Sequence, residues 1–131
     1  MLRPIGRVLS PLTDPVGAPR QGNEGAPKAW LVFEDGVRQA VSDLRPGDEV
    51  FVLTWLHHAR RDVLSVHPRD DRRSPERGVF STRSPERPNP IGLHRVEVLA
   101  IDGIRVQVSD LEAIDGTPVV DVKPVLPTDG R

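Results

Sequence analysis

Two arginines, an asparagine and three prolines stand close together in the stretch GVFSTRSPERPNPIGL, residues 78–93. Each proline fixes its own backbone and disfavours the helical conformation of the residue before it, so Arg87 and Asn89 are expected to be extended. Two residues apart on an extended chain, their side chains should project in similar directions. A guanidinium and an amide held in this way suit a carboxylate or the edge of a nucleobase. The alternative is a surface loop whose arginines only pair with Glu76 and Glu86.

Positive charge gathers around this stretch. Between Arg60 and Arg95 the chain has nine arginines and five acidic residues, a formal net charge of +4, whereas the whole chain of 131 residues has a net charge of −1. All four histidines lie in or beside the same segment, at positions 57, 58, 67 and 94. Such a segment suits an anionic partner, with Arg72 and Arg73 as candidate contacts. A solvated loop of mixed charge is the alternative that the sequence leaves open.

Several kinds of site are excluded by residue type. The chain has no cysteine, which rules out disulfides, thiolate zinc sites and cysteine nucleophiles. No G-x-G occurs, so the dinucleotide fingerprint is absent. Adjacent residues His57 and His58 would point to opposite faces of a strand, and no metal site is predicted. The N-terminal segment does not resemble a signal peptide and no apolar run is long enough to span a membrane, so a cytoplasmic protein is expected.

The elements that must position these residues are mainly short strands. Alternating or continuous apolar runs predict strands at 5–9, 29–33, 37–41, 49–56, 61–67, 94–101, 104–111 and 117–126. Asp35-Gly36 and Asp102-Gly103 predict hairpin turns, and residues 42–48 allow one helical turn at most, starting at a capping serine. The long segment 10–28 is expected to be a functional or disordered loop. This pattern indicates an all-β protein, either a barrel or a sandwich, of about seven or eight mostly antiparallel strands with long loops.

The stretch 78–93 resembles the signature of the TsaA-like (TrmO) family, the β-barrel S-adenosylmethionine-dependent methyltransferases. Further family landmarks follow in the expected order: IGRVLSP at 5–11, PRQ at 19–21, WLH at 55–57 and DGTPVVDVKP at 115–124. The resemblance covers essentially the whole chain. It implies a single TsaA-like domain over residues 1–131, a small closed or nearly closed β-barrel, without the C-terminal accessory domain of the longer bacterial members.

This chain departs from the family pattern at a few positions. His94 stands where a small polar residue often follows Gly-Leu, Ser81 stands where alanine is usual, and Val125 stands where the last motif often ends in tyrosine.

The resemblance also implies an S-adenosylmethionine site that several segments share. Its expected residues come from the long loop, from the end of the strand at 49–56, from the proline-rich stretch and from the run before DGTP. They are Gln21, Gly22, Asn23, Leu56, His57, Arg83, Leu93, Ser109, Asp110, Leu111 and Glu112. An arginine such as Arg83 suits the methionine carboxylate of the cofactor. In this family two subunits share the site, which implies a homodimer.

Asp121 and Lys123 lie on one face of the last predicted strand. They are candidate catalytic residues that orient the nucleophilic nitrogen or help to remove its proton, although an exposed salt bridge of this kind is common and weak. Alkyl transfer from a sulfonium mainly needs alignment, so a dedicated base is not required.

The characterised member of the family methylates N6 of threonylcarbamoyladenosine beside the tRNA anticodon. The first prediction is therefore the same reaction on tRNA, with substrate contacts from Arg87, Asn89, Arg72 and Arg73. One alternative is a methyltransferase of the same fold that acts on a small molecule. The other is a module that binds the cofactor or RNA without catalysis.

Overall fold

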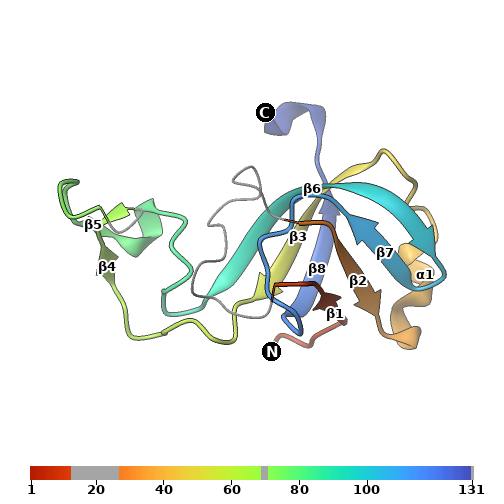
Figure 1. The fold of residues 1–131 in the computed structure, drawn as a ribbon, viewed down its shortest axis with the longest axis horizontal. Coiled ribbons are helices and arrows are strands. Elements are labelled where there is room, and N and C mark those ends of the chain that lie inside the picture. The colour runs from red at the N-terminus through yellow and green to blue at the C-terminus, as the bar shows by residue number, and fades with distance from the viewer. Residues whose placement is uncertain (13–26, 69–70, 131) are drawn as a thin grey trace.

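The computed structural model of the chain describes residues 1–12, 27–68 and 71–130. Within these ranges, six antiparallel strands form a closed barrel in the order β1-β2-β7-β6-β3-β8 (Figure 1). The strands are β1 (Gly6–Leu9), β2 (Ala29–Phe33), β3 (Glu49–Trp55), β6 (Ile91–Asp102), β7 (Arg105–Val108) and β8 (Pro118–Pro124). Pairing of Gly6 with Val119 joins β1 to β8 and closes the ring. The predicted all-β barrel is confirmed.

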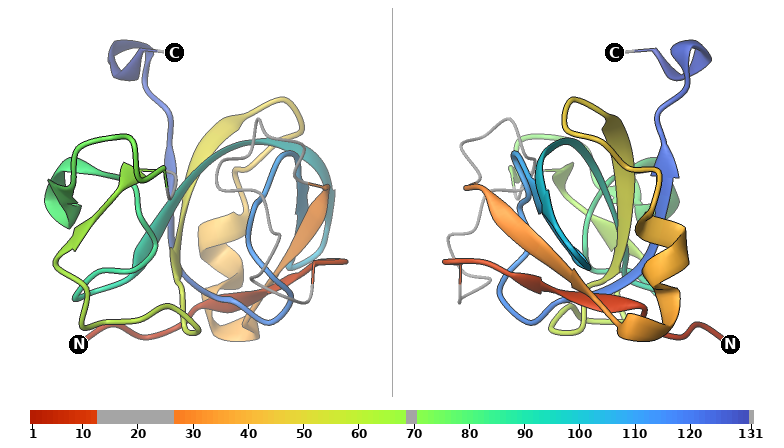
Figure 2. Two further views of the ribbon diagram at one scale, coloured as in Figure 1. Left: turned by 60° about the vertical axis from the view of Figure 1, so that its left-hand side comes forward. Right: turned by 90° about the vertical axis from the view of Figure 1, so that its right-hand side faces the viewer.

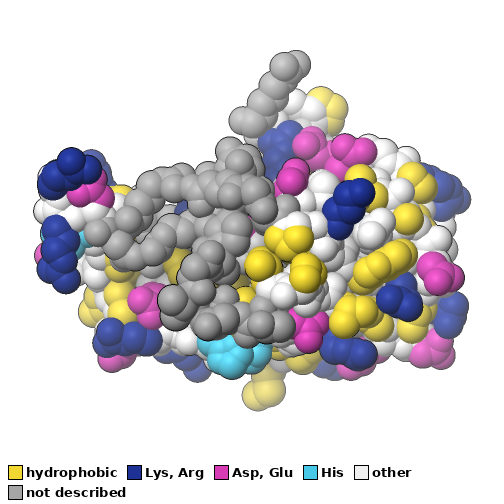
Figure 3. Space-filling model, in the orientation of Figure 1, with side chains coloured by type: hydrophobic (Ala, Val, Ile, Leu, Met, Phe, Trp, Pro, Cys, Tyr) yellow, Lys and Arg dark blue, Asp and Glu magenta, His cyan; other side chains and the backbone are white. Residues whose placement is uncertain are grey.

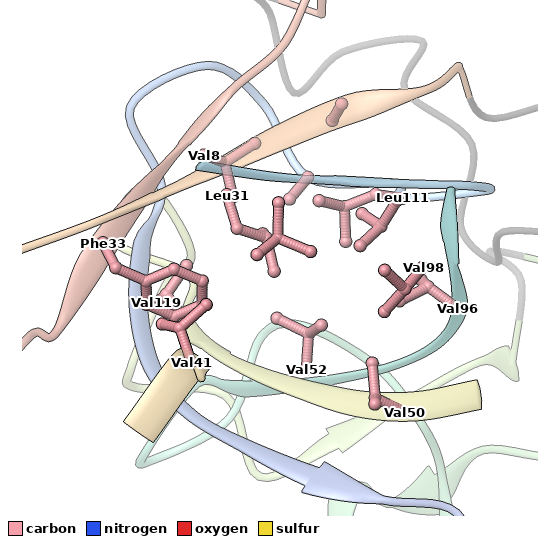
Figure 4. Close-up of a cluster of buried hydrophobic side chains, with 14 residues drawn as sticks. Val8, Leu31, Phe33, Val41, Val50, Val52, Val96, Val98, Leu111 and Val119 are labelled. Atoms are coloured by element: carbon pink, nitrogen blue, oxygen red, sulfur yellow. The ribbon is translucent and has the colours of Figure 1, made fainter. Parts of the chain in front are cut away.

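Valine and leucine side chains from alternate strand positions fill the barrel interior (Figure 4). On β3, Val50 and Val52 are buried, whereas the residues that follow each of them are partly exposed. On β6, Val96 and Val98 point inward in the same way. This is the two-residue period of a strand with one face on a core. The predicted hairpin at Asp102-Gly103 is also confirmed, because β6 pairs with β7 directly across that turn.

The predicted hairpin at Asp35-Gly36 is wrong in its second half. After β2 the chain forms a 3-10 turn, η2 (Asp35–Val37), and then one turn of helix, α1 (Arg38–Val41). Gln39 and Ala40 favour a helix more than a strand, and Val41 is buried in the barrel core. Ser42 was expected to begin a helical turn but follows one, and its hydroxyl donates a hydrogen bond to the Gln39 carbonyl.

The described residues between β3 and β6, 56–68 and 71–90, form an arm that extends away from the barrel (Figures 1 and 2). Its described part contains β4 (Ser65–Val66), β5 (Arg77–Gly78) and the 3-10 turn η4 (Val79–Ser81). The predicted strand at 61–67, paired with 49–56, is wrong because only two of its residues are extended and they pair with β5. No residue of this run belongs to the barrel core, and Leu64 is 70% exposed.

One end of the barrel brings together several of the described segments that were predicted to bind the cofactor. β3 ends and β6 begins there, since Trp55 pairs with Ile91. The loop that follows β7, residues 109–116, crosses the same region and donates backbone hydrogen bonds to the carbonyls of Val8, Leu12 and Pro27. We call this region the loop end of the barrel. Gln21, Gly22 and Asn23 lie outside the described residues. Across the ranges that are described, no helix is long and apolar enough to cross a membrane.

Candidate functional site

Two arginines hold the proline-rich stretch in place. The guanidinium of Arg87 donates hydrogen bonds to the carbonyl oxygens of Val79, Thr82 and Ser84, and its backbone amide bonds to the carbonyl of Arg60. The guanidinium is therefore occupied by the arm itself. Arg87 was predicted as a substrate contact, and in this structure it acts as the internal support of the segment that carries Arg83.

Arg61 provides the second support, which sequence reasoning did not identify. Its Nε donates to the Pro88 carbonyl at 2.8 Å and its Nη2 to the Asn89 side-chain oxygen at 3.1 Å. Its guanidinium also lies 5.2 Å from the ring centre of Trp55 on β3, within range of a cation–π contact. Arg61 thus ties the proline-rich stretch to the barrel. Asn89 is exposed, and its side chain bonds to Arg61, whereas the Arg87 guanidinium bonds to backbone carbonyls of the arm.

Leu56 and His57 continue directly from β3 at the loop end. The Leu56 amide donates to the Pro90 carbonyl at 2.8 Å, which places this segment against the start of β6. The imidazoles of His57 and His58 lie 4.1 Å apart between ring centres. Partial burial, and then the charge of His58, lower the pKa of His57 below its usual value. An uncharged His57 suits a site for a cationic sulfonium.

Leu93, Asp121 and Lys123 lie on the outer face of the barrel. Leu53 of β3 pairs with Leu93 on one side and with Asp121 on the other. Two strand spacings separate Leu93 from Asp121, about 10 Å. Lys123 Nζ lies 3.5 Å from Asp121 Oδ2, and both side chains are substantially exposed. The structure thus aligns one predicted cofactor contact with the two predicted catalytic residues on a single surface.

The predicted run Ser109–Glu112 begins the loop that follows β7. Asp110 has φ of 52°, the only positive value of a non-glycine residue in the described chain. Asp tolerates this left-handed conformation better than most residues, and such outliers gather at functional sites. Leu111 is fully buried in the core, so only its backbone could contact a ligand. Ser109 accepts a hydrogen bond from the Glu97 amide of β6.

Glu112 ends this run in a buried hydrogen-bonded chain that sequence reasoning missed. Its Oε1 lies 2.6 Å from Nδ1 of His94, whose Nε2 lies 2.7 Å from the hydroxyl oxygen of Thr54. Thr54 is 0% and His94 3% exposed. We call these three residues the relay. Strand parity could have revealed two of its members, because Thr54 and His94 occupy the inward positions that continue from Val52 and Val96. Contact with Glu112 depends on a loop and has no sequence signal.

Glu112 and Leu93 thus lie on opposite sides of β6. His94 carries the contact to Glu112 from the inner face, whereas Leu93 is 40% exposed on the outer face. Arg83 is exposed on the arm and has no hydrogen bond to another described residue. Among the described residues, the predicted cofactor positions are therefore spread over the loop end, the outer face of β6 and the arm.

Two of the predicted RNA contacts, Arg72 and Arg73, lie toward the outer part of the arm, where Figure 3 shows Lys and Arg side chains at the left. Arg73 is 92% exposed and pairs with Asp71, with 3.0 Å between Nε and Oδ1. Arg72 is exposed as well. In the described ranges, no group of three or more His, Asp or Glu side chains could hold a metal ion.

Comparison with known proteins places this chain among relatives with similar sequences. A model of the tRNA-methyltransferase O N-terminal domain matches residues 7–129. A probable S-adenosyl-L-methionine-binding protein of Methanothermobacter thermautotrophicus is 45% identical over 123 residues, which cover 94% of this chain and 88% of that protein. An S-adenosyl-L-methionine-binding protein of Archaeoglobus fulgidus is 41% identical over 127 residues, with 97% and 90% covered.

Solved structures show the same fold. The crystal structure of TrmO from Pseudomonas aeruginosa superposes with a TM-score of 0.76 at 28% identity, covering 98% of this chain and 56% of that chain. Another TrmO crystal structure gives a TM-score of 0.77 at 30% identity, covering 98% and 58%. The chain thus spans a little over half the length of these two TrmO chains.

Proposed function

This chain belongs to the tRNA-methyltransferase O family, and from that premise we propose that it is an S-adenosylmethionine-dependent methyltransferase that acts on tRNA. The observation that carries the proposal is the match over residues 7–129, which includes every described segment at the loop end. Two close relatives are described as S-adenosyl-L-methionine-binding proteins. Both match nearly their whole length, so the barrel is the part they share with this chain.

The residues of the loop end, together with Arg83 on the arm, fit this cofactor chemically. Arg83 is an exposed guanidinium available to a carboxylate. Leu56 and Leu93 offer partly exposed apolar surface for an adenine ring. The lowered pKa of His57 keeps positive charge away from a sulfonium, and Glu112 supplies a carboxylate.

When bound, S-adenosylmethionine supplies an activated methyl group on its sulfonium. In the proposed reaction the S–CH3 bond breaks as the N–CH3 bond forms at N6 of threonylcarbamoyladenosine. The products are S-adenosylhomocysteine, the methylated nucleoside and one proton. The chain's own residues mainly orient the acceptor nitrogen. We assign this role to Asp121 and Lys123, whose ion pair on the outer face leaves both side chains accessible. The proton leaves to Asp121 or to water.

A homodimer would complete the site. Leu93 and Glu112 flank β6 from opposite sides, so one small ligand reaches both only around the strand end or between two chains. The outer face offers a surface for pairing, since Ile91 and Leu93 are each 40% exposed and Leu53 lies beside them. Light scattering with cofactor present should give about twice the 14.5 kDa mass of the chain. A mass of one chain at micromolar concentration would contradict the dimer.

Two measurements test the proposed function in sequence. Calorimetry with S-adenosylmethionine should first show stoichiometric binding. Tritium from the methyl group should then enter RNA prepared from a strain that lacks the enzyme. RNA from a strain that has the enzyme should take up much less tritium. Binding without transfer to RNA would favour a small-molecule acceptor or a non-catalytic module. An absence of binding would contradict the proposal as a whole.

A further inference from the structure

The relay is a largely buried polar cluster, in which Thr54 is 0%, His94 3% and the Glu112 side chain 14% exposed. It joins β3, β6 and the loop after β7 through two short hydrogen bonds, from Thr54 to His94 and from His94 to Glu112. Burial of three polar groups in a barrel of valines is unfavourable unless each finds a partner. A barrel that needed only a core could place an apolar residue at position 94. The relay is therefore better explained by its contact with Glu112 than by a contribution to the stability of the barrel.

The backbone around the relay is adapted to it. Gly92 occupies the inward position between Thr54 and His94, and a methyl group there would lie 2.6 Å from His94 Nε2 and closer still to the Thr54 hydroxyl. Only glycine leaves room for both partners. On the other side, the left-handed Asp110 turns the chain so that Glu112 reaches back toward β6.

The relay leaves Glu112 able to bind something else. The hydrogen bond from His94 uses Oε1, and Oε2 has no hydrogen bond to any described residue. The Glu112 side chain is 14% exposed, unlike the fully buried Leu111 beside it. A carboxylate with one oxygen fixed and the other available is suited to accept hydrogen bonds from a hydroxyl or an ammonium group.

We propose that His94 is a positioning residue that fixes the Glu112 carboxylate, and with it the loop 109–112, to receive the hydrogen-bond donors of S-adenosylmethionine. This inference rests on the proposed function. Those donors are the ribose hydroxyls and the ammonium of the methionine part. His94 donates through Nδ1 to Glu112 and accepts through Nε2 from the Thr54 hydroxyl, and in this arrangement both ring nitrogens have partners.

Two substitutions of His94 separate positioning from simple packing. In His94→Asn the amide nitrogen takes the place of Nδ1, so the contact with Glu112 is kept and that with Thr54 is lost. In His94→Gln the amide reaches the place of Nε2, so the contact with Thr54 is kept and that with Glu112 is lost. Calorimetry should show His94→Asn within about threefold of wild-type affinity for S-adenosylmethionine and His94→Gln weaker by about tenfold to a hundredfold. The reverse order would overturn the inference.

A control and a double substitution sharpen this test. Val98→Ala opens a cavity on the same inner face of β6, where Val98 is 0% exposed. This variant should be less stable than wild type but should bind S-adenosylmethionine with the same affinity. The double variant His94→Gln/Glu112→Ala should bind no more weakly than Glu112→Ala alone, because both changes act through one carboxylate. Losses that simply add would contradict a shared route.

The source of the donor is tested with 5′-methylthioadenosine, which keeps the ribose and lacks the amino-acid part. If Glu112 accepts hydrogen bonds from the ribose hydroxyls, Glu112→Ala lowers the affinity for 5′-methylthioadenosine and for S-adenosylmethionine by the same factor. If Glu112 accepts a hydrogen bond from the ammonium group, only the affinity for S-adenosylmethionine falls. Equal affinity of wild type and Glu112→Ala for both ligands would overturn the inference.

Hydrogen exchange tests the positioning role without any ligand. Amides of residues 109–116 should exchange faster in His94→Gln than in wild type or in Val98→Ala. Unchanged exchange would overturn the positioning role. A wild-type protein that binds no S-adenosylmethionine would refute the proposed function and this inference together, whereas wild-type binding with unaltered affinity in His94→Gln would refute the inference alone.

Discussion

Gly92 and His94 are neighbours on the inner face of β6, and a side-chain carbon on Gly92 would lie 2.6 Å from Nε2 of His94. The same carbon would also collide with the Thr54 hydroxyl. Neither partner can withdraw, because both are buried and bonded to each other. The glycine of the IGL motif is therefore required by the space that the relay needs.

Gly92→Ala should accordingly destabilise the protein by about 1–3 kcal/mol, the usual cost of overpacking a core. Denaturant unfolding followed by fluorescence of the two tryptophans measures the change. Gly36→Ala is the matched control, because nothing lies within 4 Å of a side-chain carbon at that position. It should remain within about 0.5 kcal/mol of wild type. Equal effects of the two substitutions would contradict the steric account.

The two arginines of the proline-rich stretch should respond differently to substitution. Arg83→Ala removes an exposed side chain, so it should weaken the binding of S-adenosylmethionine by about 1.5–3 kcal/mol. The midpoint of unfolding should stay unchanged. Arg87→Ala leaves the carbonyls of Val79, Thr82 and Ser84 without their donor. Arg87→Ala should make the amides of residues 79–90 exchange hydrogen faster, and it should also lower the affinity for the cofactor. Wild-type affinity in Arg83→Ala would show that another group meets the methionine carboxylate.

Much of the fold could be predicted from the sequence, because barrel strands bury every second residue. The hairpin at Asp102-Gly103 combines clean alternation with a strong turn signal, and the structure has it as expected. The segment 37–41 was predicted as a strand, but Val37 ends η2 and residues 38–41 form α1, from which Val41 is buried in the core while Val37 packs against it. In the arm, the alternation at 61–67 does not predict a barrel strand, because none of these residues belongs to the barrel core.

The site was less predictable than the fold. Family motifs indicate which segments take part, and Leu56 does lie against the start of β6. Motifs do not show which face a side chain takes or which partner occupies it. Arg87 is used internally by the arm, and His94 meets Glu112 across a loop. Both facts depend on tertiary contacts that no local pattern encodes.

Cofactor affinity should depend on pH through His57. Its pKa is lowered by partial burial and by His58, so the imidazole is neutral above its usual value of 6.5. A lowered pKa in the folded state means that its contribution to stability is present above the unfolded pKa and is lost as pH falls through the folded pKa. A charged His57 would also repel the sulfonium, so affinity for S-adenosylmethionine should fall as pH drops through the lowered pKa of His57.

His57→Asn should flatten this dependence in calorimetry between neutral and mildly acidic pH. The control is His67→Asn, because His67 lies on the arm and bonds to the Ser74 carbonyl through Nδ1. It should leave the pH profile as in wild type. An unchanged slope in His57→Asn would place His57 away from the sulfonium.

The arm should bind RNA through its arginines. If Arg72 and Arg73 meet phosphates, each contact adds close to one unit to the salt slope of binding. Reversal of both residues to Glu should therefore weaken tRNA binding and flatten its salt dependence, with affinity for S-adenosylmethionine unchanged. Arg38→Glu is the control, because Arg38 forms a similar exposed pair with Asp35 beside α1 on the barrel. Equal salt slopes in all three proteins would make the arm a solvated loop.

The central claim is that this protein places a methyl group on N6 of threonylcarbamoyladenosine in tRNA. The most direct test is nucleoside mass spectrometry of tRNA from a strain that lacks the enzyme, after incubation with the protein and S-adenosylmethionine. The account predicts that the threonylcarbamoyladenosine peak decreases and that one nucleoside heavier by a single methyl group replaces it. An unchanged nucleoside profile, from a protein that binds the cofactor, would contradict it.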